Sequence, residues 1–207
     1  MLSVEKTVLI LLAAGKSRRF GDIGSKLDED FLGRPLGLHV AVALEDMPFR
    51  ERLAIVNSQK LDYGRHNFTS IHNPNRDIGM ATSVQLGVRH AQELGAEAVL
   101  IALADMPRVT AAHIYRLFDA TEGPMSVVAS SDGVDPKPPA IFGAGQFQCL
   151  LELDGDTGAR ELVRGGRHVV TAPAELIDVD TPDELERLRA LVHSPAAITR
   201  AEARPTG

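Results

Sequence analysis

The feature that most constrains this sequence is the alternation of short apolar runs with helical patterns in its first half. Two of these runs, Val8–Leu12 and Ala98–Leu103, consist of apolar residues only, which is typical of strands buried on both faces of a parallel sheet. Amphipathic segments at 36–44 and 81–94 repeat apolar residues at helical spacing. Strands and helices in alternation predict an α/β fold with a mainly parallel sheet and helices on both faces. In such sheets ligands bind at the carboxyl ends of the strands.

The rest of the chain continues this pattern with shorter elements. Residues 53–56, 68–71, 125–129, 140–142, 167–171 and 176–179 are expected to be strands, and residues 110–120, 147–151 and 159–163 helices. The best-marked helix follows Thr181, with Pro182 at its first position and Glu184 completing a capping box. A chain of 207 residues suits one domain, which is expected to cover residues 1–193. Residues 194–207 are expected to form a flexible tail because they are rich in Ser, Pro, Ala and Arg.

Composition excludes several classes of function. The net charge of −6 argues against binding to nucleic acid or to an anionic membrane, both of which require a basic face. The single cysteine, Cys149, rules out an internal disulfide and a CxxC metal site, and its apolar surroundings favour burial. The apolar run at 8–14 is too short to span a membrane, and its flanking charges do not suit a signal peptide. We therefore expect a cytoplasmic protein without a membrane partner.

The loop after the first strand is the first candidate site. It reads Ala13-Ala14-Gly15-Lys16-Ser17-Arg18-Arg19-Phe20-Gly21, with Lys26 downstream. Glycine lets the backbone approach a ligand, and consecutive N–H groups can hold phosphate, while Arg19 and Lys26 can neutralise its charge. The spacing matches neither a P-loop nor a dinucleotide fingerprint. The alternative is a basic surface loop.

Three aspartates are candidate metal ligands. Asp105 follows the strand 98–103 and precedes Met106-Pro107, where one carboxylate suits Mg²⁺ that is also bound by substrate phosphates. Asp178 and Asp180 would share one face if their segment were a strand, and either could supply a second carboxylate. The alternatives are a turn aspartate at 105 and acidic residues that favour a helix N-terminus at 178 and 180.

Two further segments carry glycine where a backbone could approach a ligand. Residues 73–83 lead a strand into a helix, with Gly79 in the loop and Ser83 in the first helical turn; exposed backbone there could contact a base. Residues 155–160 place Asp156 and Thr157 before a helix whose N-terminus could face an anion. An ordinary loop and cap is the alternative in each case.

Together these motifs resemble the MobA-like nucleotidyltransferase family, in particular its molybdenum cofactor cytidylyltransferase branch. The matching segments occur in the family's order over about residues 7–192, and they are Ala13–Gly21 with Lys26, Asn73–Ser83, Asp105–Pro107, Pro139–Phe142, Gly155–Arg160 and Asp178–Leu185. The resemblance implies a three-layer αβα fold of the nucleotide-diphospho-sugar transferase type, which is Rossmann-like.

The resemblance also implies a role for each matching residue. Ala13, Ala14, Gly15, Ser17, Arg19 and Lys26 would belong to the nucleotide site, with the triphosphate held by Gly15, Ser17, Arg19 and Lys26. Asp105 and, in preference to Asp178, Asp180 would bind Mg²⁺. The Gly79–Ser83 turn would lie near the base, and Ala14 favours CTP because the guanylyl branch typically has glycine there. Arg19, Lys26 and Asp105 are thus the expected catalytic residues.

Two departures from the family pattern concern the surroundings of the site. Asp28, Glu29 and Asp30 follow Lys26 where the family usually has more apolar residues, and Lys137-Pro138 replaces the usual Gly-His before Pro139. The expected reaction is transfer of CMP from CTP to a phosphorylated acceptor such as molybdopterin, whose product would pass to a molybdoenzyme or its chaperone. The alternatives are the same chemistry with GTP or a sugar-phosphate acceptor, and a non-catalytic nucleotide-binding protein that carries a cofactor.

Overall fold

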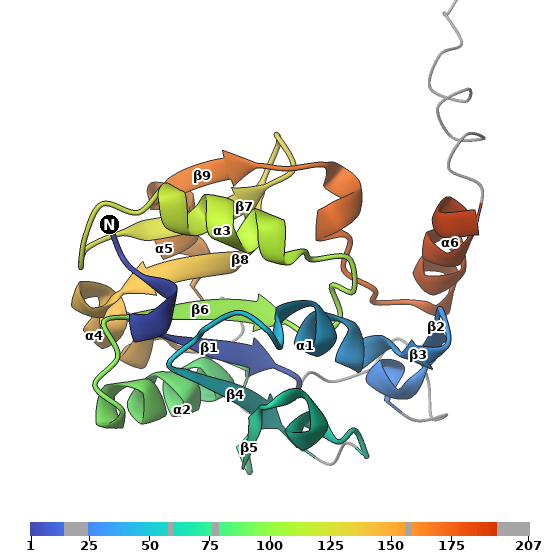
Figure 1. Ribbon diagram of the computed structural model, residues 1–207, viewed down its shortest axis with the longest axis horizontal. Coiled ribbons are helices and arrows are strands. Elements are labelled where there is room, and N and C mark those ends of the chain that lie inside the picture. Colours follow the sequence, from blue (N-terminus) through green and yellow to red (C-terminus); the bar gives the residue numbers. More distant parts are fainter. Residues whose placement is uncertain (15–24, 58–59, 76–78, 156–158, 194–207) are drawn as a thin grey trace, which may run out of the picture.

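Parallel strands form the centre of the fold. The computed structural model describes residues 1–14, 25–57, 60–75, 79–155 and 159–193. Within these residues seven strands form one sheet in the order β5-β4-β1-β6-β8-β7-β9, shown in Figure 1. They are β1 Thr7–Leu12, β4 Glu51–Val56, β5 Thr69–His72, β6 Ala98–Leu103, β7 Val127–Ser131, β8 Pro136–Gly143 and β9 Arg167–Val170. β8 runs antiparallel to β6 and β7, while the other neighbouring strands run parallel.

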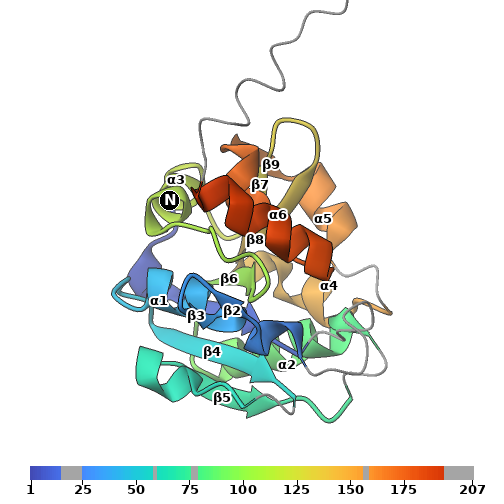
Figure 2. The same ribbon diagram turned by 90° about the vertical axis from the view of Figure 1, so that its right-hand side faces the viewer.

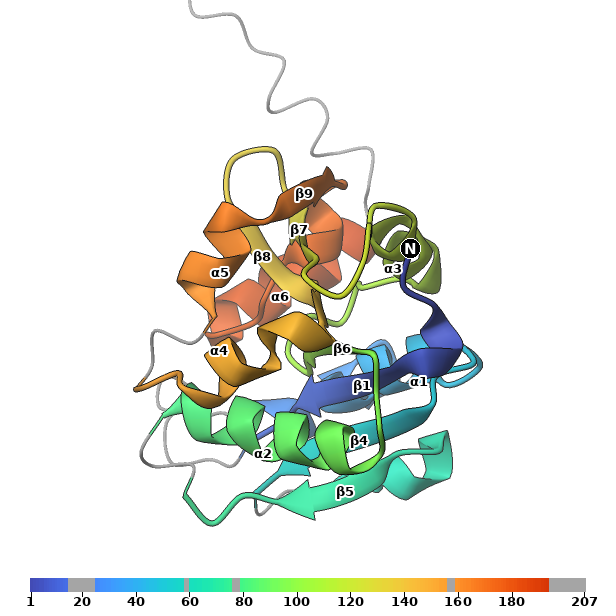
Figure 3. The ribbon, with the colours of Figure 1, turned by 90° about the vertical axis from the view of Figure 1, so that its left-hand side faces the viewer.

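The helices cover both faces of this sheet. They are α1 His39–Leu44, α2 Met80–Glu93, α3 Ala111–Asp119, α4 Phe147–Leu151, α5 Arg160–Gly165 and α6 Pro182–His193. Figure 3 shows α2, α4 and α5 on one side of the strands and α1 and α3 on the other. The predicted three-layer, mainly parallel α/β fold is therefore confirmed.

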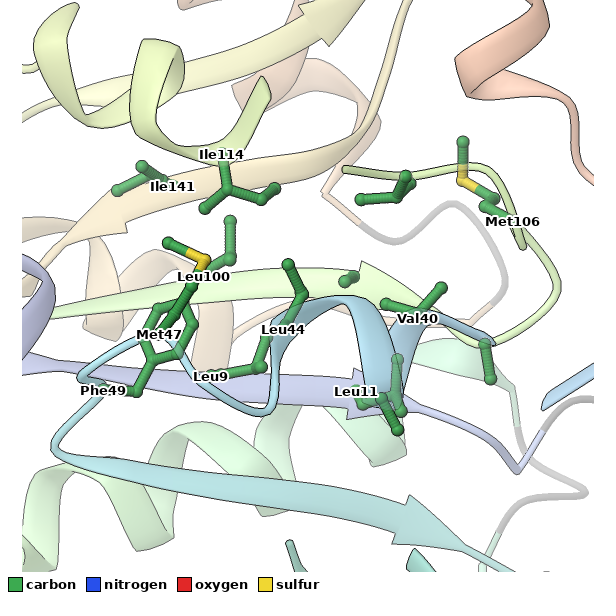
Figure 4. Close-up of a cluster of buried hydrophobic side chains, with 14 of the residues drawn as sticks. Leu9, Leu11, Val40, Leu44, Met47, Phe49, Leu100, Met106, Ile114 and Ile141 are labelled. Carbon is green, nitrogen blue, oxygen red and sulfur yellow. The ribbon is translucent and has the colours of Figure 1, made fainter. Parts of the chain in front are cut away.

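The two faces of β1 supply two separate cores because alternate side chains of a strand point to opposite faces. Leu9 and Leu11 pack with α1 and α3 residues such as Leu44 and Ile114, as Figure 4 shows. Val8 and Ile10 pack on the other face with residues of α2, α4 and α5. Every residue of β1 is buried, which fixes the strand in the middle of the sheet and explains why its sequence is apolar from Val8 to Leu12.

Gly87 sets the distance between α2 and β1. A Cβ atom at Gly87 would lie 2.7 Å from Cγ2 of Ile10, so Gly87→Ala is expected to lower the free energy of unfolding by about 1–3 kcal/mol through overpacking. The matched control is Gly165→Ala in α5, where a Cβ would have no atom within 4 Å and the change is expected to be neutral or stabilising by up to about 1 kcal/mol. Urea denaturation measures both; equal losses would contradict this account of the packing.

A small satellite core lies at the carboxyl-end edge of the sheet. Here β2 Asp30–Phe31 and β3 Arg34–Pro35 form a hairpin that lies beside α6, as Figure 2 shows. Its apolar residues are Phe31, Leu36, Val179, Leu185 and Leu188. Packing within this cluster holds the start of α6 next to the end of β6.

Two sequence predictions are wrong. Residues 176–179 do not form a strand: a 3₁₀ helix spans Pro173–Leu176, and Val179 N–H then donates to the Asp105 carbonyl, so the chain crosses the end of β6 instead of running along a strand. Cys149 is exposed, because the short helix α4 turns Phe147 and Leu150 toward the core. The tail at 194–207 lies outside the described residues. The helices within the described residues include none with the length and hydrophobicity of a membrane span.

Candidate active site

The candidate site lies where β1 and β6 end. Ala13 N–H donates to the Ile55 carbonyl and Ala104 N–H to the Leu12 carbonyl, so both strands remain tied to the sheet up to the loops that follow them. Ala13 and Ala14 are buried. The predicted phosphate-binding residues Gly15, Ser17 and Arg19 lie outside the described residues, whereas Lys26 lies at the start of a 3₁₀ helix, Lys26–Asp28.

Three charged side chains from distant parts of the sequence meet at this edge. The Lys26 ammonium donates to Asp105 Oδ2 and to Asp180 Oδ1, both at 2.7 Å. The Lys26 side chain is only 8% exposed, against 20% for Asp105 and 40% for Asp180. Lys26 therefore links the two carboxylates predicted to bind a metal, a contact that the sequence analysis did not anticipate.

Burial and charge shift the protonation equilibria of this cluster. Burial lowers the pKa of Lys26, but Asp105 and Asp180 outweigh this effect and raise the pKa above its usual value. Burial raises the pKa of the Asp105 carboxyl, Lys26 partly offsets the rise, and Asp178 and Asp180 add to it. The ammonium is thus the charge that makes ionised carboxylates tolerable at this depth.

The second oxygen of Asp105 shows how the cluster could take a metal. Asp105 Oδ1 is buried and has no hydrogen-bond partner among the described residues, which is costly for a carboxylate oxygen unless a cation or donor reaches it. No group of three His, Cys, Asp or Glu side chains is placed to hold a metal within the described part of the chain. The donor set of Asp105 and Asp180 fits Mg²⁺, which is typically held by one or two carboxylates plus substrate phosphates.

The start of α6 fixes the position of Asp180. Glu184 Oε2 accepts hydrogen bonds from the backbone N–H groups of Asp180 and Thr181, both at 2.8 Å, and Thr181 Oγ1 accepts from Glu184 N–H. The predicted capping box is therefore confirmed. Asp178, the alternative ligand, is exposed and has no direct bond to Lys26 among those observed.

The loop from Asn73 to Ser83 is held by its own side chains. Asn73 Nδ2 donates to Thr82 Oγ1 at 3.0 Å and to Ser83 Oγ at 2.8 Å. Gly79 has φ of 140°, a left-handed conformation that favours glycine, and it immediately precedes α2. Ser83 is buried and its hydroxyl accepts from Asn73 within this turn, and the place of Gly79 and Ser83 near a base stays a prediction. Residues 76–78 are outside the described part.

A cleft of about 500 Å³ opens beside the charged cluster. Asp105, Asp178 and Asp180 lie in its wall, and its apolar lining includes Leu12 and Phe142. Its basic lining residues are Lys137, Arg160 and Arg164. Sequence reasoning noted Arg160 within a motif and Lys137 as a departure, but it missed Arg164, whose helical spacing from Arg160 is the signal that could have identified it. The predicted helix start at Asp156 and Thr157 lies outside the described residues.

The acidic residues after Lys26 do not crowd the cluster. Asp28 and Asp30 are exposed, and Glu29 is half-buried. Because exposed charges are screened by water and salt, these residues add little repulsion toward a bound polyphosphate.

One family model and one curated relative each match most of this chain. The model of the MobA-like NTP transferase domain matches residues 9–172. Purine catabolism protein PucB from Bacillus subtilis (strain 168) is 32% identical over 197 residues, which cover 87% of this chain and 94% of PucB.

Solved structures share the fold. The homologue of Mycobacterium tuberculosis Rv0371c from Mycobacterium sp. strain JC1 superposes with a TM-score of 0.75 at 23% identity, covering 93% of this chain and 100% of that one. Rv0371c from Mycobacterium tuberculosis H37Rv in complex with manganese has a TM-score of 0.68 at 23% identity and covers 89% of this chain and 98% of that one.

Proposed function

The chain belongs to the MobA-like NTP transferase family, and we propose that it is a cytidylyltransferase that moves CMP from CTP to molybdopterin and releases pyrophosphate. The observation that carries the proposal is the meeting of Lys26, Asp105 and Asp180 at the ends of β1 and β6. Carboxylates for a metal and a cation for phosphate at one sheet edge are what nucleotidyl transfer requires.

In this reaction a phosphate oxygen of the acceptor attacks the α-phosphorus of CTP, opposite the departing pyrophosphate. Arg19 and Lys26 stabilise the negative charge that develops on the leaving group, and Gly15 and Ser17 hold the triphosphate. Catalysis rests on fixing both substrates in line and on electrostatic stabilisation of the developing charge, and no covalent enzyme intermediate is needed. The cleft beside Asp105 offers the space for the acceptor.

Asp105 and Asp180 would hold the divalent metal. Mg²⁺ bound there would screen the phosphate oxygens from one another and from the attacking oxygen. The unpartnered Asp105 Oδ1 and the manganese in the related Rv0371c structure support this assignment.

Ala14 is proposed to set the choice of base. Its methyl group would crowd a purine edge and leave room for a pyrimidine, with CTP preferred over GTP by about 1–3 kcal/mol, the range for one carbon in a pocket. Ala14→Gly is expected to relax that preference and leave CTP turnover largely intact. Measuring kcat/KM for CTP and GTP checks this; equal use of both nucleotides by the unmutated protein would point to a broader nucleotidyltransferase.

The remaining parts of the proposal concern the setting of the reaction. We propose one catalytic unit over residues 1–193, action in the cytoplasm, and delivery of the product to a molybdoenzyme or its chaperone. Nucleic acid and membranes are not expected as partners.

Pyrophosphate release tests the proposed function against its rivals. The assay takes each NTP in turn with Mg²⁺ and offers molybdopterin, a sugar 1-phosphate or no acceptor. We expect release with CTP and molybdopterin together. Release with a sugar phosphate or with GTP would identify the alternative substrate, and nucleotide binding without release under any condition would favour the non-catalytic carrier.

A further inference from the structure

A series of buried hydrogen bonds links α3, β7 and β8 on the α3 side of the sheet. Arg116 Nη2 donates to His113 Nδ1 at 3.1 Å, and His113 Nε2 lies 2.7 Å from Ser130 Oγ, which donates to the Pro139 carbonyl at 2.8 Å. Arg116 also donates to Thr171 Oγ1 at 2.8 Å. His113 and Ser130 are both 0% exposed. The series thus crosses from a helix, through β7, to β8.

A bulge in β8 explains why Ser130 is needed there. Ala129 pairs with Ala140, but the next residue, Ser130, pairs with Lys137. Pro138 and Pro139 are therefore extra residues on β8, and proline cannot donate to the ladder. Pro139 is buried, and the Ser130 hydroxyl supplies a donor to its carbonyl.

The direction of these hydrogen bonds fixes the state of His113. A guanidinium can only donate, so Nδ1 of His113 must accept and the ring proton must be on Nε2. Nε2–H then donates to Ser130 Oγ, whose own hydrogen goes to the Pro139 carbonyl. Every donor in this series of hydrogen bonds, from Arg116 to the Pro139 carbonyl, faces an acceptor only while His113 is neutral.

The bulge also places residues in the cleft. Lys137 and Pro138 line the cleft, and Lys137 forms a 2.7 Å ion pair with Asp132. We call the segment Lys137–Pro139 the cleft wall. Its front faces the space assigned to the acceptor, and its back is held at Pro139 by Ser130.

We infer that His113 is a positioning residue, which acts through Ser130 to hold the cleft wall in the shape that binds the acceptor. The inference rests on the proposed function, since it takes the cleft as the acceptor site. In this role His113 makes no contact with substrate. Loss of its contact with Ser130 is expected to affect binding of the acceptor and not of the nucleotide, because the predicted nucleotide-binding residues lie on other segments of the protein.

The charge around His113 gives this arrangement a pH dependence. Burial lowers the pKa of His113, Arg116 lowers it further, and Glu175 opposes them. These two residues, from α3 and the 3₁₀ helix Pro173–Leu176, are the charged groups that act on the ring, whereas Ser130 and the Pro139 carbonyl are neutral. Because the folded-state pKa lies below the ordinary value, the neutral ring persists at neutral pH and is lost only as pH falls through the lowered pKa.

The first test is a comparison of two Michaelis constants measured with the whole 207-residue chain. Ser130→Ala is expected to raise the KM for molybdopterin about tenfold, the cost of leaving one buried acceptor without its donor, and to change the KM for CTP by less than about twofold. Ser130→Thr keeps the hydroxyl and is expected to restore the acceptor KM. Ser126→Ala is the matched control, because Ser126 Oγ bonds only to the turn at Glu122 and Gly123 among the contacts observed.

The second test uses pH. The acceptor KM of the wild type, divided by that of His113→Gln, is expected to stay constant near neutral pH and to rise only at pH values below the ordinary histidine pKa of about 6.5, because Gln keeps a donor and an acceptor but cannot titrate. The ratio cancels the titration of the acceptor's own phosphate. A flat ratio, or equal increases in both KM values in Ser130→Ala, would overturn the inference.

A structural readout separates this inference from the proposed function. Long-range ¹H–¹⁵N spectra of the wild type are expected to show neutral His113 with its proton on Nε2, and Ser130→Ala is expected to speed amide exchange at Lys137 and Ala140. If molybdopterin gives no turnover in the wild type, the proposed function fails while these spectra still report on the wall. A proton on Nδ1, or unchanged exchange, would overturn the inference even in an active enzyme.

Discussion

Asp105→Asn is expected to lower kcat for nucleotidyl transfer by roughly two to three powers of ten, the scale for removing one charge-stabilising group. The amide preserves the size of the side chain, but it removes the negative charge that would hold a divalent metal. It also ends the ion pair with Lys26, whose ammonium lies 2.7 Å from Asp105 Oδ2. Initial rates of pyrophosphate release with saturating CTP and molybdopterin measure the effect.

Asp178→Asn is the matched control for this prediction. It removes the same charge from a nearby residue, but Asp178 is exposed, and Asp180 is the carboxylate that bonds to Lys26. We expect a loss of less than about tenfold, since an exposed charge is screened. Near-normal activity of Asp105→Asn, or equal losses in the two variants, would contradict the assignment of Asp105 and Asp180 as the metal pair.

Lys26→Met is expected to reduce both turnover and stability. Removing one partner of a buried ion pair leaves an uncompensated charge and costs about 3–5 kcal/mol, here at Asp105. Loss of the cation is also expected to lower kcat about a hundredfold or more, as for other groups that stabilise transition-state charge. Urea denaturation and pyrophosphate release measure the two effects separately.

The stability loss of Lys26→Met carries a pH signature. Burial already raises the pKa of Asp105, and Lys26 opposes that rise, so in the variant the pKa rises further. A carboxyl whose pKa is raised in the folded state lowers the free energy of unfolding when it is ionised, at pH values above that pKa. The loss disappears at lower pH, where the carboxyl is protonated. The difference in unfolding free energy between wild type and variant is therefore expected to shrink between pH 7.5 and about pH 5. An equal difference at both pH values would show that Lys26 acts by packing alone.

Elements with strong local signals were predictable from sequence. β1 and β6 coincide with continuous apolar runs because each is buried on both faces, and α6 begins where its capping box indicates. The hairpin β2–β3 was missed, since its two-residue strands are too short to show a period. β8 is longer than predicted because Pro136, Pro138 and Pro139 mask the strand pattern.

The candidate site was likewise predictable from sequence only in part. Asp105 could be placed at the carboxyl-end edge of the sheet because it follows a buried strand, whereas Asp180 was assigned to the same site through the family resemblance. That Lys26 bridges them could not be predicted, because the contact joins side chains 79 and 154 positions apart in sequence. The series of hydrogen bonds through His113 and Ser130 was equally invisible, since it depends on how α3 packs against β7. Residues 176–179 were wrongly predicted as a strand because a tertiary contact, the hydrogen bond from Val179 N–H to the Asp105 carbonyl, determines the path of this segment.

The most direct test of the account is to follow both products of one reaction. CTP labelled in its α-phosphate is incubated with Mg²⁺, molybdopterin and the full chain, and pyrophosphate and labelled acceptor are counted together. We predict one labelled cytidylyl product for each pyrophosphate released by the wild type, and at least about a hundredfold less of both products per unit time with Asp105→Asn. Labelled product formed equally well by Asp105→Asn, or no labelled product from the wild type with CTP or any other NTP, would contradict it.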